Sequence, residues 1–162
     1  NCLNCGHNYK RASSICSINV NVILKNGLNS IQEALNDTVN MKNTIDCSVC
    51  KTPTSRVISY GPHLIFDTSV LSDVNYMKTL NISQCQYILD SVAKNIAIRD
   101  KNYSLAGIIS YIRHGSGYND GHYVAYTYTG LNWYKYDDMA YKRTIVTTKE
   151  EILPHVLIYV KC

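Results

Sequence analysis

Polar and apolar positions in the C-terminal half of the chain alternate in a way that predicts a β-hairpin. From His122 to Tyr128, apolar or aromatic residues occupy every second position, which is the period of a strand. Residues 129–132 carry a turn signal, and β-favouring aromatic residues resume at 133–136. The two predicted strands are therefore joined by a short turn.

The register of this hairpin decides which side chains meet at its open end. A two-residue turn at 129–130 places His122 opposite Asp137, and a four-residue loop shifts the pairing by about two positions while keeping the two ends together. In either register an imidazole and a carboxylate meet. The carboxylate can orient the ring through one nitrogen and stabilise its cation, so that the other nitrogen can transfer protons. A surface pair on an ordinary hairpin is the alternative interpretation.

Shorter patterns predict the remaining elements. Alternation over 18–24 predicts a strand, whereas Ser30 and Glu33 fit a capping box at the start of a short helix. The apolar face of that helix contains Ile31, Ala34, Leu35 and Val39. Apolar runs predict further strands, at 57–60, 105–112 and 156–160. Residues 87–98 fit either a helix or two short strands, and 147–152 begins with threonines that can cap a helix.

Composition and charge limit the class of protein. The 162 residues suit one domain, and 46% hydrophobic with 17% charged residues is typical of a globular chain. The net charge of +4 comes without a Lys/Arg run, so nucleic-acid binding is not indicated. No apolar run reaches membrane-spanning length and no signal peptide is visible, so we expect no membrane association.

Four of the seven cysteines form two CxxC motifs, Cys2–Cys5 and Cys47–Cys50. Two such turns can present four thiolates to a tetrahedral structural zinc ion, and His7 is close enough in sequence to be a substitute ligand. Disulfides or free thiols are the alternative, but an odd cysteine count without a secretory signal argues against a disulfide framework. Four protein ligands leave no position for water, so this zinc would not be catalytic.

Specific residues around the predicted hairpin resemble the histidine box of the ubiquitin-specific proteases, a family of papain-like cysteine proteases. The stretches GHYVAY at 121–126 and WYKYDD at 133–138 are similar to Gly-His-Tyr-x-Ala-Tyr and Trp-Tyr-x-Phe-Asp-Asp. The lead-in, YSLAGII at 103–109 followed by His114 and a glycine, also resembles the family pattern. Residues 62–66 resemble the family's Leu-Pro-x-x-Leu-Ile-Leu core strand. The match covers nearly the whole chain and is densest over 103–138.

The resemblance implies an α+β fold, with an antiparallel papain-like palm and zinc-bearing fingers. Residues 1–60 would form the fingers portion and 61–162 the palm portion of one partial catalytic domain. The family carries its nucleophilic cysteine in a thumb segment N-terminal to the fingers, which we expect to lie outside this chain. Cys85 superficially echoes that cysteine motif but stands on the wrong side of the fingers.

The resemblance also assigns roles to residues. His122 would be the general base, Asp137 would orient it, and Asp138 would bind substrate or polarise the oxyanion site. The implied substrate-binding residues are Gly121, Tyr123, His114 and Trp133. The implied partners are ubiquitin or a ubiquitin-like modifier, its conjugates and the N-terminal thumb segment, in the cytoplasm or nucleus.

Three functions remain open from the sequence. The first is a cysteine isopeptidase to which this chain contributes His and Asp, and retention of both residues favours it. The second is an inactive pseudo-protease that serves as a binding scaffold. The third is a viral-type papain-like protease that also removes ubiquitin. At 67–69 the chain has Asp-Thr-Ser where the family usually has Lys-Arg-Phe, which bears on recognition of ubiquitin itself.

Overall fold

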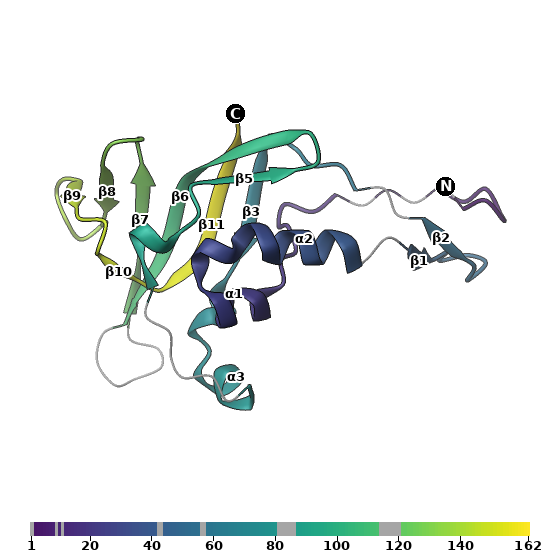
Figure 1. Cartoon of the computed structure of the whole chain (residues 1–162), viewed down its shortest axis with the longest axis horizontal. Coiled ribbons are helices and arrows are strands. Elements are labelled where there is room, and N and C mark those ends of the chain that lie inside the picture. The colour runs from purple at the N-terminus through teal and green to yellow at the C-terminus, as the bar shows by residue number, and fades with distance from the viewer. Residues whose placement is uncertain are drawn as a thin grey trace.

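A seven-stranded antiparallel sheet forms the centre of the computed structural model, which describes residues 2–8, 10, 12–41, 44–55, 58–80, 87–113 and 121–162. Six strands run in the order β3, β11, β6, β7, β8 and β9, and β5 pairs with β6 beside this path (Figure 1). Their bounds are β3 His63–Asp67, β5 Asn95–Ile98, β6 Lys101–Arg113, β7 Gly121–Tyr128, β8 Trp133–Tyr136, β9 Thr144–Val146 and β11 Pro154–Lys161.

The strand predictions over 62–66, 105–112 and 156–160 are confirmed by β3, β6 and β11. In β6 the buried residues are odd-numbered up to Gly107 and even-numbered from Ile108 onward. At the same point β11 pairs first with Gly107 and then with Leu105, so Ala106 is an extra residue in β6. Such a bulge turns the following side chains to the other face of the strand. The half of β6 that pairs with the start of β7 therefore buries even-numbered residues.

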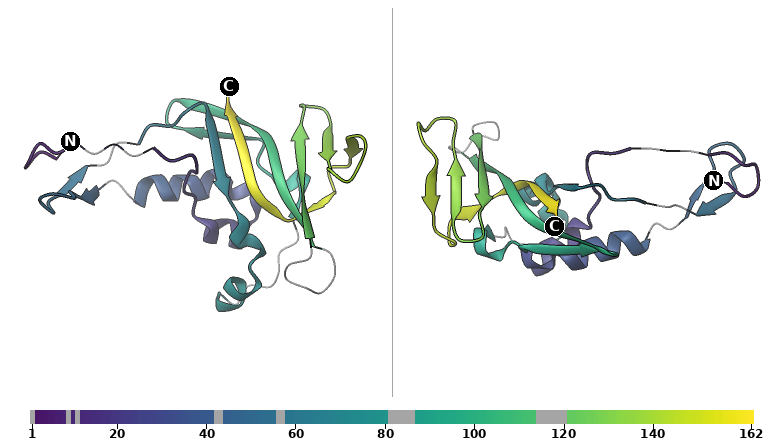
Figure 2. Two further views of the ribbon diagram at one scale, coloured as in Figure 1. Left: turned by 180° about the vertical axis from the view of Figure 1, so that it is seen from behind. Right: turned by 90° about the horizontal axis from the view of Figure 1, so that it is seen from above.

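Two helices cover one face of the sheet (Figure 2). They are α1 (Val20–Asn26) and α2 (Ile31–Met41), joined by the 3₁₀ turn η1 (Leu28–Ser30). Their apolar side chains belong to the same hydrophobic core as the inner face of the sheet. The predicted helix after Ser30 is therefore confirmed. The hydrogen bonds of the expected capping box are not seen in this described segment, where Ser30 ends the 3₁₀ turn and its hydroxyl donates to the Gly27 carbonyl at 2.6 Å. The Glu33 carboxylate instead accepts from the Asn26 side chain at 3.2 Å.

The strand expected over 18–24 is wrong, because residues 20–26 are helical. The Asn19 side chain accepts a hydrogen bond from the Asn21 amide and so caps the helix. The adjacent residues Ile23 and Leu24 are both buried, which a strand with one solvent-facing side does not allow. Burial against the sheet thus overrides the β preference of the valines and isoleucines in this segment.

The cysteine motifs lie at the end of a projection that extends away from the sheet and helices (Figures 1 and 2). Its two short strands are β1 (Thr44–Asp46) and β2 (Pro53–Ser55), which pair with each other. Helices α1 and α2 fall within residues 1–60 but pack in the core beside the sheet. The predicted boundary at residue 60 stays a prediction.

Short elements complete the fold. They are η2 (Ser69–Ser72), α3 (Val74–Thr79), β4 (Tyr87–Ile88), η3 (Leu89–Ser91) and β10 (Glu151–Ile152). The ambiguous segment 87–98 thus forms two short strands separated by a 3₁₀ turn, and 147–152 ends in a strand rather than a helix. Residues 58–60 are not in a strand, and the preceding Val57 lies outside the described residues. Among the described helices, none is long and apolar enough to cross a membrane. The α+β fold with a large antiparallel sheet is confirmed.

Candidate active site and metal centre

The hairpin of β7 and β8 closes with a four-residue loop. Tyr128 pairs with Trp133, and the Thr129 amide donates to the Asn132 carbonyl across the loop at 3.1 Å. Gly130 has φ 89°, a conformation that glycine adopts without steric cost. Of the two registers that the sequence allowed, the structure therefore has the longer loop.

His122 and Asp137 meet at the open end of this hairpin. The Nε2 atom of His122 lies 3.2 Å from Oδ1 of Asp137, and both side chains are about one-fifth exposed, at 22% each. The longer loop shifts the direct pairing by two residues, so the contact runs diagonally across the strands. Partial burial weakens the screening of the two charges by water and salt. The attraction between His122 and Asp137 is therefore stronger than in a fully exposed surface ion pair.

The Asp137 carboxylate is fixed by the backbone that follows it. The Asp137 Oδ1 atom accepts a hydrogen bond from the Met139 amide at 3.0 Å, and the backbone carbonyl of Asp137 accepts one from the Ala140 amide at 3.0 Å. The Met139 amide, then His122 and Lys135, lower the pKa of Asp137. The group is therefore held as a carboxylate, which is the form that stabilises a neighbouring imidazolium.

Asp138 also lies at this end of the hairpin. Its carboxylate, that of Asp137 and the His122 ring each offer an atom within 4.8 Å of the others. Alternation along a strand predicts that the two aspartates point to opposite faces, but β8 ends at Tyr136 and the chain turns at once. Strand alternation therefore ends at residue 136, and Asp138 is an exposed neighbour of the pair.

Gly121 begins β7 in a space that has no room for a side chain. A Cβ atom there would lie 2.4 Å from the Ile112 carbonyl oxygen and 2.4 Å from the Tyr111 hydroxyl. The neighbouring strand β6 is therefore packed directly against the glycine backbone. The next residue, His122, lies opposite Ile112 in the β6–β7 register.

We expect Gly121→Ala to destabilise the protein by roughly 1–3 kcal/mol, the usual cost of overpacking, because the obstructing Ile112 oxygen belongs to the backbone. Chemical denaturation with an unchanged m-value would measure it. Gly61→Ala is the matched control, since a Cβ at Gly61 meets nothing within 4 Å. Equal stability of the two variants would contradict the close approach.

The other expected substrate-binding residues differ in exposure. Tyr123 is 54% exposed, next to His122. Trp133 is 1% exposed, and its ring contacts Tyr128, 5.1 Å away, and Lys94, whose Nζ is 4.9 Å from the ring centre. Trp133 therefore supports the hairpin from the core side. His114 lies outside the described residues.

None of the described cysteines is placed to act with His122. Four of them gather in the projection. Cys16 pairs with Phe66 on the outer side of β3, so β3, β11 and β6 separate it from β7. The Cys162 Sγ atom lies 2.8 Å from the Ser104 hydroxyl, and Ser104 is about 26 Å along β6 from the partner of His122. Cys85 lies outside the described residues.

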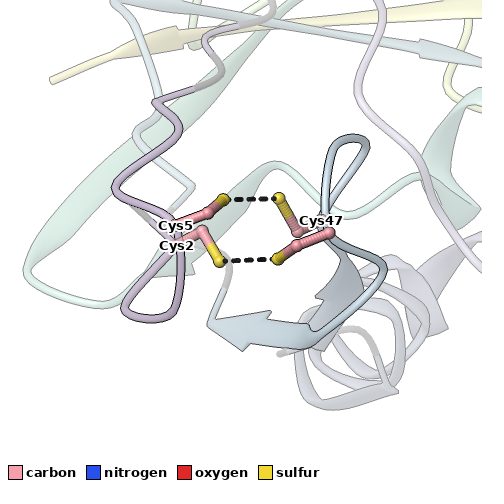
Figure 3. A group of neighbouring side chains, drawn as sticks. Cys2, Cys5 and Cys47 are labelled. Atoms are coloured by element: carbon pink, nitrogen blue, oxygen red, sulfur yellow. Dashed lines mark hydrogen bonds between the residues drawn. The ribbon is translucent and has the colours of Figure 1, made fainter.

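The metal centre consists of two similar cysteine knuckles that face each other (Figure 3). In each knuckle the amide of the first cysteine donates to a carbonyl five residues later, Cys2 to His7 and Cys47 to Thr52, both at 2.9 Å. The residue after the second cysteine has positive φ, 70° at Gly6 and 59° at Lys51. Separate segments thus use the same backbone turn to direct two sulfurs inward.

The four sulfurs fit a zinc ion. Cys2 and Cys50 are 3.5 Å apart, Cys5 and Cys47 are 3.7 Å apart, and all four sulfurs lie within 4.8 Å of one another. A tetrahedron with Zn–S bonds of about 2.3 Å has edges of about 3.8 Å. Hydrogen bonds from the backbone of Cys50 and Val49 lower the pKa of Cys47, and those from Thr52 lower the pKa of Cys50 to about 5. The hydrogen bond from the His7 backbone lowers the pKa of Cys5, but the neighbouring thiols and burial outweigh it and raise that pKa to about 12. The cluster is consistent with a structural zinc site on Cys2, Cys5, Cys47 and Cys50.

Some residues around the hairpin were not predicted from the sequence. The Lys135 Nζ atom lies 3.7 Å from the Glu150 carboxylate, which also accepts a hydrogen bond from the Tyr126 hydroxyl at 3.4 Å. His155 contacts Tyr123 from β11. These partners come from segments remote in sequence, and no local motif marks them.

A comparison with protein-family models identifies one family, described as ubiquitin carboxyl-terminal hydrolase, over residues 20–159. The matched region contains the β7–β8 hairpin and the second cysteine knuckle. A comparison with curated proteins gives no match.

Several solved structures are similar to the chain. The Pan2 pseudoubiquitin hydrolase–RNA exonuclease module of Saccharomyces cerevisiae, in complex with RNA, has 17% sequence identity and a TM-score of 0.47, over 91% of this chain and 28% of that one. A SAGA DUB module of Ubp8, Sgf11, Sus1 and Sgf73 bound to monoubiquitin has 19% identity and a TM-score of 0.40, over 75% and 29%. An essential yeast splicing factor has 12% identity and a TM-score of 0.44, over 86% and 47%. The chain thus spans less than half of each of these relatives.

Proposed function

The chain belongs to the ubiquitin carboxyl-terminal hydrolase family, and from this premise we propose that it forms the fingers and palm of a thiol-dependent isopeptidase. The substrate class is ubiquitin or a ubiquitin-like modifier joined to a lysine. The nucleophilic cysteine comes from a thumb segment outside these 162 residues, and the protein acts in the cytoplasm or nucleus.

The observation that supports this proposal is the contact between His122 and Asp137 at 3.2 Å, at the end of a hairpin that falls within the family match. Asp137 contacts Nε2 and so orients the His122 ring for proton exchange with the thiol. Asp137 also stabilises the imidazolium that forms, because its low pKa keeps it charged. A binding scaffold that catalyses no reaction does not require the contact between His122 and Asp137.

The reaction follows from the residue types. His122 takes the proton of the cysteine thiol, and the thiolate attacks the carbonyl carbon at the modifier's C-terminal glycine. The bond to the lysine nitrogen breaks as His122 returns its proton to the leaving amine. His122 then removes a proton from water, which attacks the thioester and releases the modifier's carboxylate and the thiol. Asp138 lies close enough to assist substrate binding or to polarise the oxyanion site.

The cysteine centre would contribute to folding rather than to chemistry. Zinc held by Cys2, Cys5, Cys47 and Cys50 would have four protein ligands and no open position for water. At the open end of the hairpin Gly121 and Tyr123 border the substrate, whereas Trp133 supports the hairpin from the core at its loop end. His114, outside the described residues, is assigned to the same substrate site.

An inactive binding scaffold is the second candidate. The observation that favours it is the distance of the described cysteines from His122. In that case the chain would bind modifier without cleaving it, and no segment would provide a thiol.

We expect the 162-residue chain alone to form no covalent adduct with a ubiquitin probe that carries a C-terminal electrophile, because no described thiol is placed beside His122. Intact mass spectrometry would detect the adduct. A protein that joins the chain to a cysteine-bearing thumb segment is the positive control, and only the isopeptidase proposal predicts labelling there. An adduct on Cys85 of the isolated chain would place the nucleophile inside these residues and refute the thumb assignment.

A further inference from the structure

The four sulfurs of the metal centre form two close pairs, and each pair joins one cysteine knuckle to the other (Figure 3). The Sγ atom of Cys2 lies 3.5 Å from that of Cys50, and the Sγ atom of Cys5 lies 3.7 Å from that of Cys47. The first cysteine of each knuckle therefore contacts the second cysteine of the opposite knuckle.

Each pair combines a buried cysteine with a more accessible one. Cys2 and Cys47 are each 4% exposed, whereas Cys5 is exposed and Cys50 is half-buried. The pairs lie at the end of the projection, away from the sheet and the helices (Figure 1). A small solute therefore reaches Cys5 or Cys50 before it reaches the partner in the other knuckle.

Hydrogen bonds hold the knuckles in this arrangement. The Asn4 side-chain amide donates to the Thr52 hydroxyl at 3.2 Å, and that hydroxyl also lies 3.4 Å from the Cys50 Sγ atom. Within the knuckles, the amides of Gly6 and Lys51 close each turn by donating to the carbonyl of the first cysteine, at 2.8 and 2.9 Å. The protein's own contacts thus support the pairing of sulfurs across the gap.

The two contacts select one disulfide pattern. Four cysteines can form two disulfides in three ways, one of which closes each CxxC motif on itself while the other two join the knuckles. A disulfide bond is about 2.05 Å long, so sulfurs that are 3.5 and 3.7 Å apart need to approach by roughly 1.5 Å. The pattern that matches the contacts bridges Cys2 to Cys50 and Cys5 to Cys47.

We propose that the cluster is a site of reversible oxidation, at which a hydroperoxide converts two knuckles held by zinc into two knuckles joined by the disulfides Cys2–Cys50 and Cys5–Cys47. The ion is released, because the thiolate is the form of cysteine that binds a metal. The starting state rests on the zinc site, and the pairing rests on the sulfur contacts. Neither depends on the isopeptidase proposal.

Each bridge forms in two steps. The thiolate of Cys5 or Cys50 attacks one oxygen of the hydroperoxide, the O–O bond breaks, an oxyanion leaves, and the sulfur becomes a sulfenic acid. The buried thiolate of the other knuckle then attacks that sulfur, the S–O bond breaks, and hydroxide leaves. The two sulfurs lose one electron each and the hydroperoxide gains two, so complete conversion consumes about two hydroperoxide molecules per chain.

Disulfide mapping tests the pairing. The zinc-loaded chain is treated with hydrogen peroxide, its remaining thiols are alkylated, and unreduced peptides are analysed by mass spectrometry. Chymotrypsin cleaves after Leu3 and elastase after Val49, which separates the two cysteines of each CxxC motif. We expect bridges between Cys2 and Cys50 and between the other two cysteines, with the loss of about one zinc per chain. Dithiothreitol and added zinc should restore the starting state.

Several results of this mapping would overturn the proposal. They are bridges within the CxxC motifs, bridges from Cys2 to Cys47 and from Cys5 to Cys50, and sulfinic acids without any bridge. A chain that retains its zinc after both bridges have formed, or that binds no zinc when reconstituted, would also overturn it. These results leave the isopeptidase proposal untouched, since that proposal concerns the hairpin of His122 and Asp137.

A dione probe for sulfenic acids tests the order of the two steps. With less than one equivalent of peroxide, we expect roughly tenfold more probe on Cys5 and Cys50 than on Cys2 and Cys47, because oxidation follows exposure of the thiolate. Equal labelling of all four cysteines would overturn the assignment of the accessible cysteines as the first to be oxidised.

Hydrogen exchange tests whether the bridges replace the ion. Two bridges between segments 2–8 and 44–55 restrict the unfolded chain, so exchange there should be roughly tenfold slower in the oxidised protein than in the reduced, chelated protein. Equal exchange in the two forms would overturn the claim that the knuckles stay joined.

Cys162→Ser is the matched control for oxidation. Cys162 is exposed, but its sulfur contacts the Ser104 hydroxyl rather than a thiol. The substitution should therefore leave the two bridges and the release of zinc unchanged. A pairing that changes in this variant would overturn the proposal, because the bridges would then not follow from the contacts within the cluster.

Discussion

Replacing His122 by alanine, in a protein that joins this chain to its cysteine-bearing segment, should lower turnover by at least roughly 10²–10⁴-fold. In the proposed mechanism, the substitution removes the group that accepts the thiol proton and later protonates the leaving amine. It also leaves Asp137, whose pKa His122 helps to lower, without its partner. Hydrolysis of a modifier–fluorophore conjugate measures the loss, with circular dichroism to verify folding.

Substitutions of the two aspartates provide the matched controls for this experiment. Asp137→Asn keeps the shape but removes the charge that stabilises the imidazolium, so we expect a smaller but clear loss. Asp138→Asn should cost less, because Asp138 is exposed and Asp137 makes the 3.2 Å contact. A larger loss for Asp138 would exchange the roles of the two aspartates. Full activity of the folded His122→Ala protein would reject the catalytic role.

Removal of zinc should unfold the projection while leaving the sheet largely intact. Binding free energies for structural zinc reach roughly 10–16 kcal/mol in small domains, far more than the short β1–β2 pair can supply. Purified protein should contain about one zinc per chain. Chelation or Cys47→Ser should then increase hydrogen exchange over 2–8 and 44–55, whereas the strands of the seven-stranded sheet, which pack in a separate core, should stay protected.

Cys162→Ser serves as the control for the metal experiment, since that thiol contacts Ser104 and lies outside the cluster. It should leave both the zinc content and the exchange pattern unchanged. A folded, metal-free wild-type protein whose Cys47→Ser variant has the same exchange in both segments would show that the cysteines do not hold a structural ion.

The sequence indicates the main features of the site because each depends on local patterns. Alternation and a turn signal predict the hairpin, and its two ends meet whichever loop length is chosen. The contact of His122 with Asp137 was therefore predictable before the register was known. The CxxC spacing likewise predicts the sulfur cluster, since each knuckle is a local backbone turn.

The incorrect predictions arise where tertiary packing decides. Residues 18–24 alternate like a strand, yet Ile23 and Leu24 are buried together in a helix that covers the sheet. Strand alternation would turn Asp138 away from His122, but β8 already ends at Tyr136, and the Asp138 carboxylate lies within 4.8 Å of a ring nitrogen of His122. The contact between Tyr123 and His155 joins positions far apart in sequence, so no periodicity marks it.

The position of β11 has a consequence for how the protein is made. Residues 154–161 follow all the other strands in sequence, yet they pair with β3 on one side and with β6 on the other. Until that strand leaves the ribosome, both neighbours expose unpaired edges, which are templates for association with other chains. The sheet therefore completes only after synthesis of residue 161, through contacts that span most of the chain and form slowly. A nascent or truncated product that stops before β11 would be a substrate for chaperones rather than a smaller folded domain.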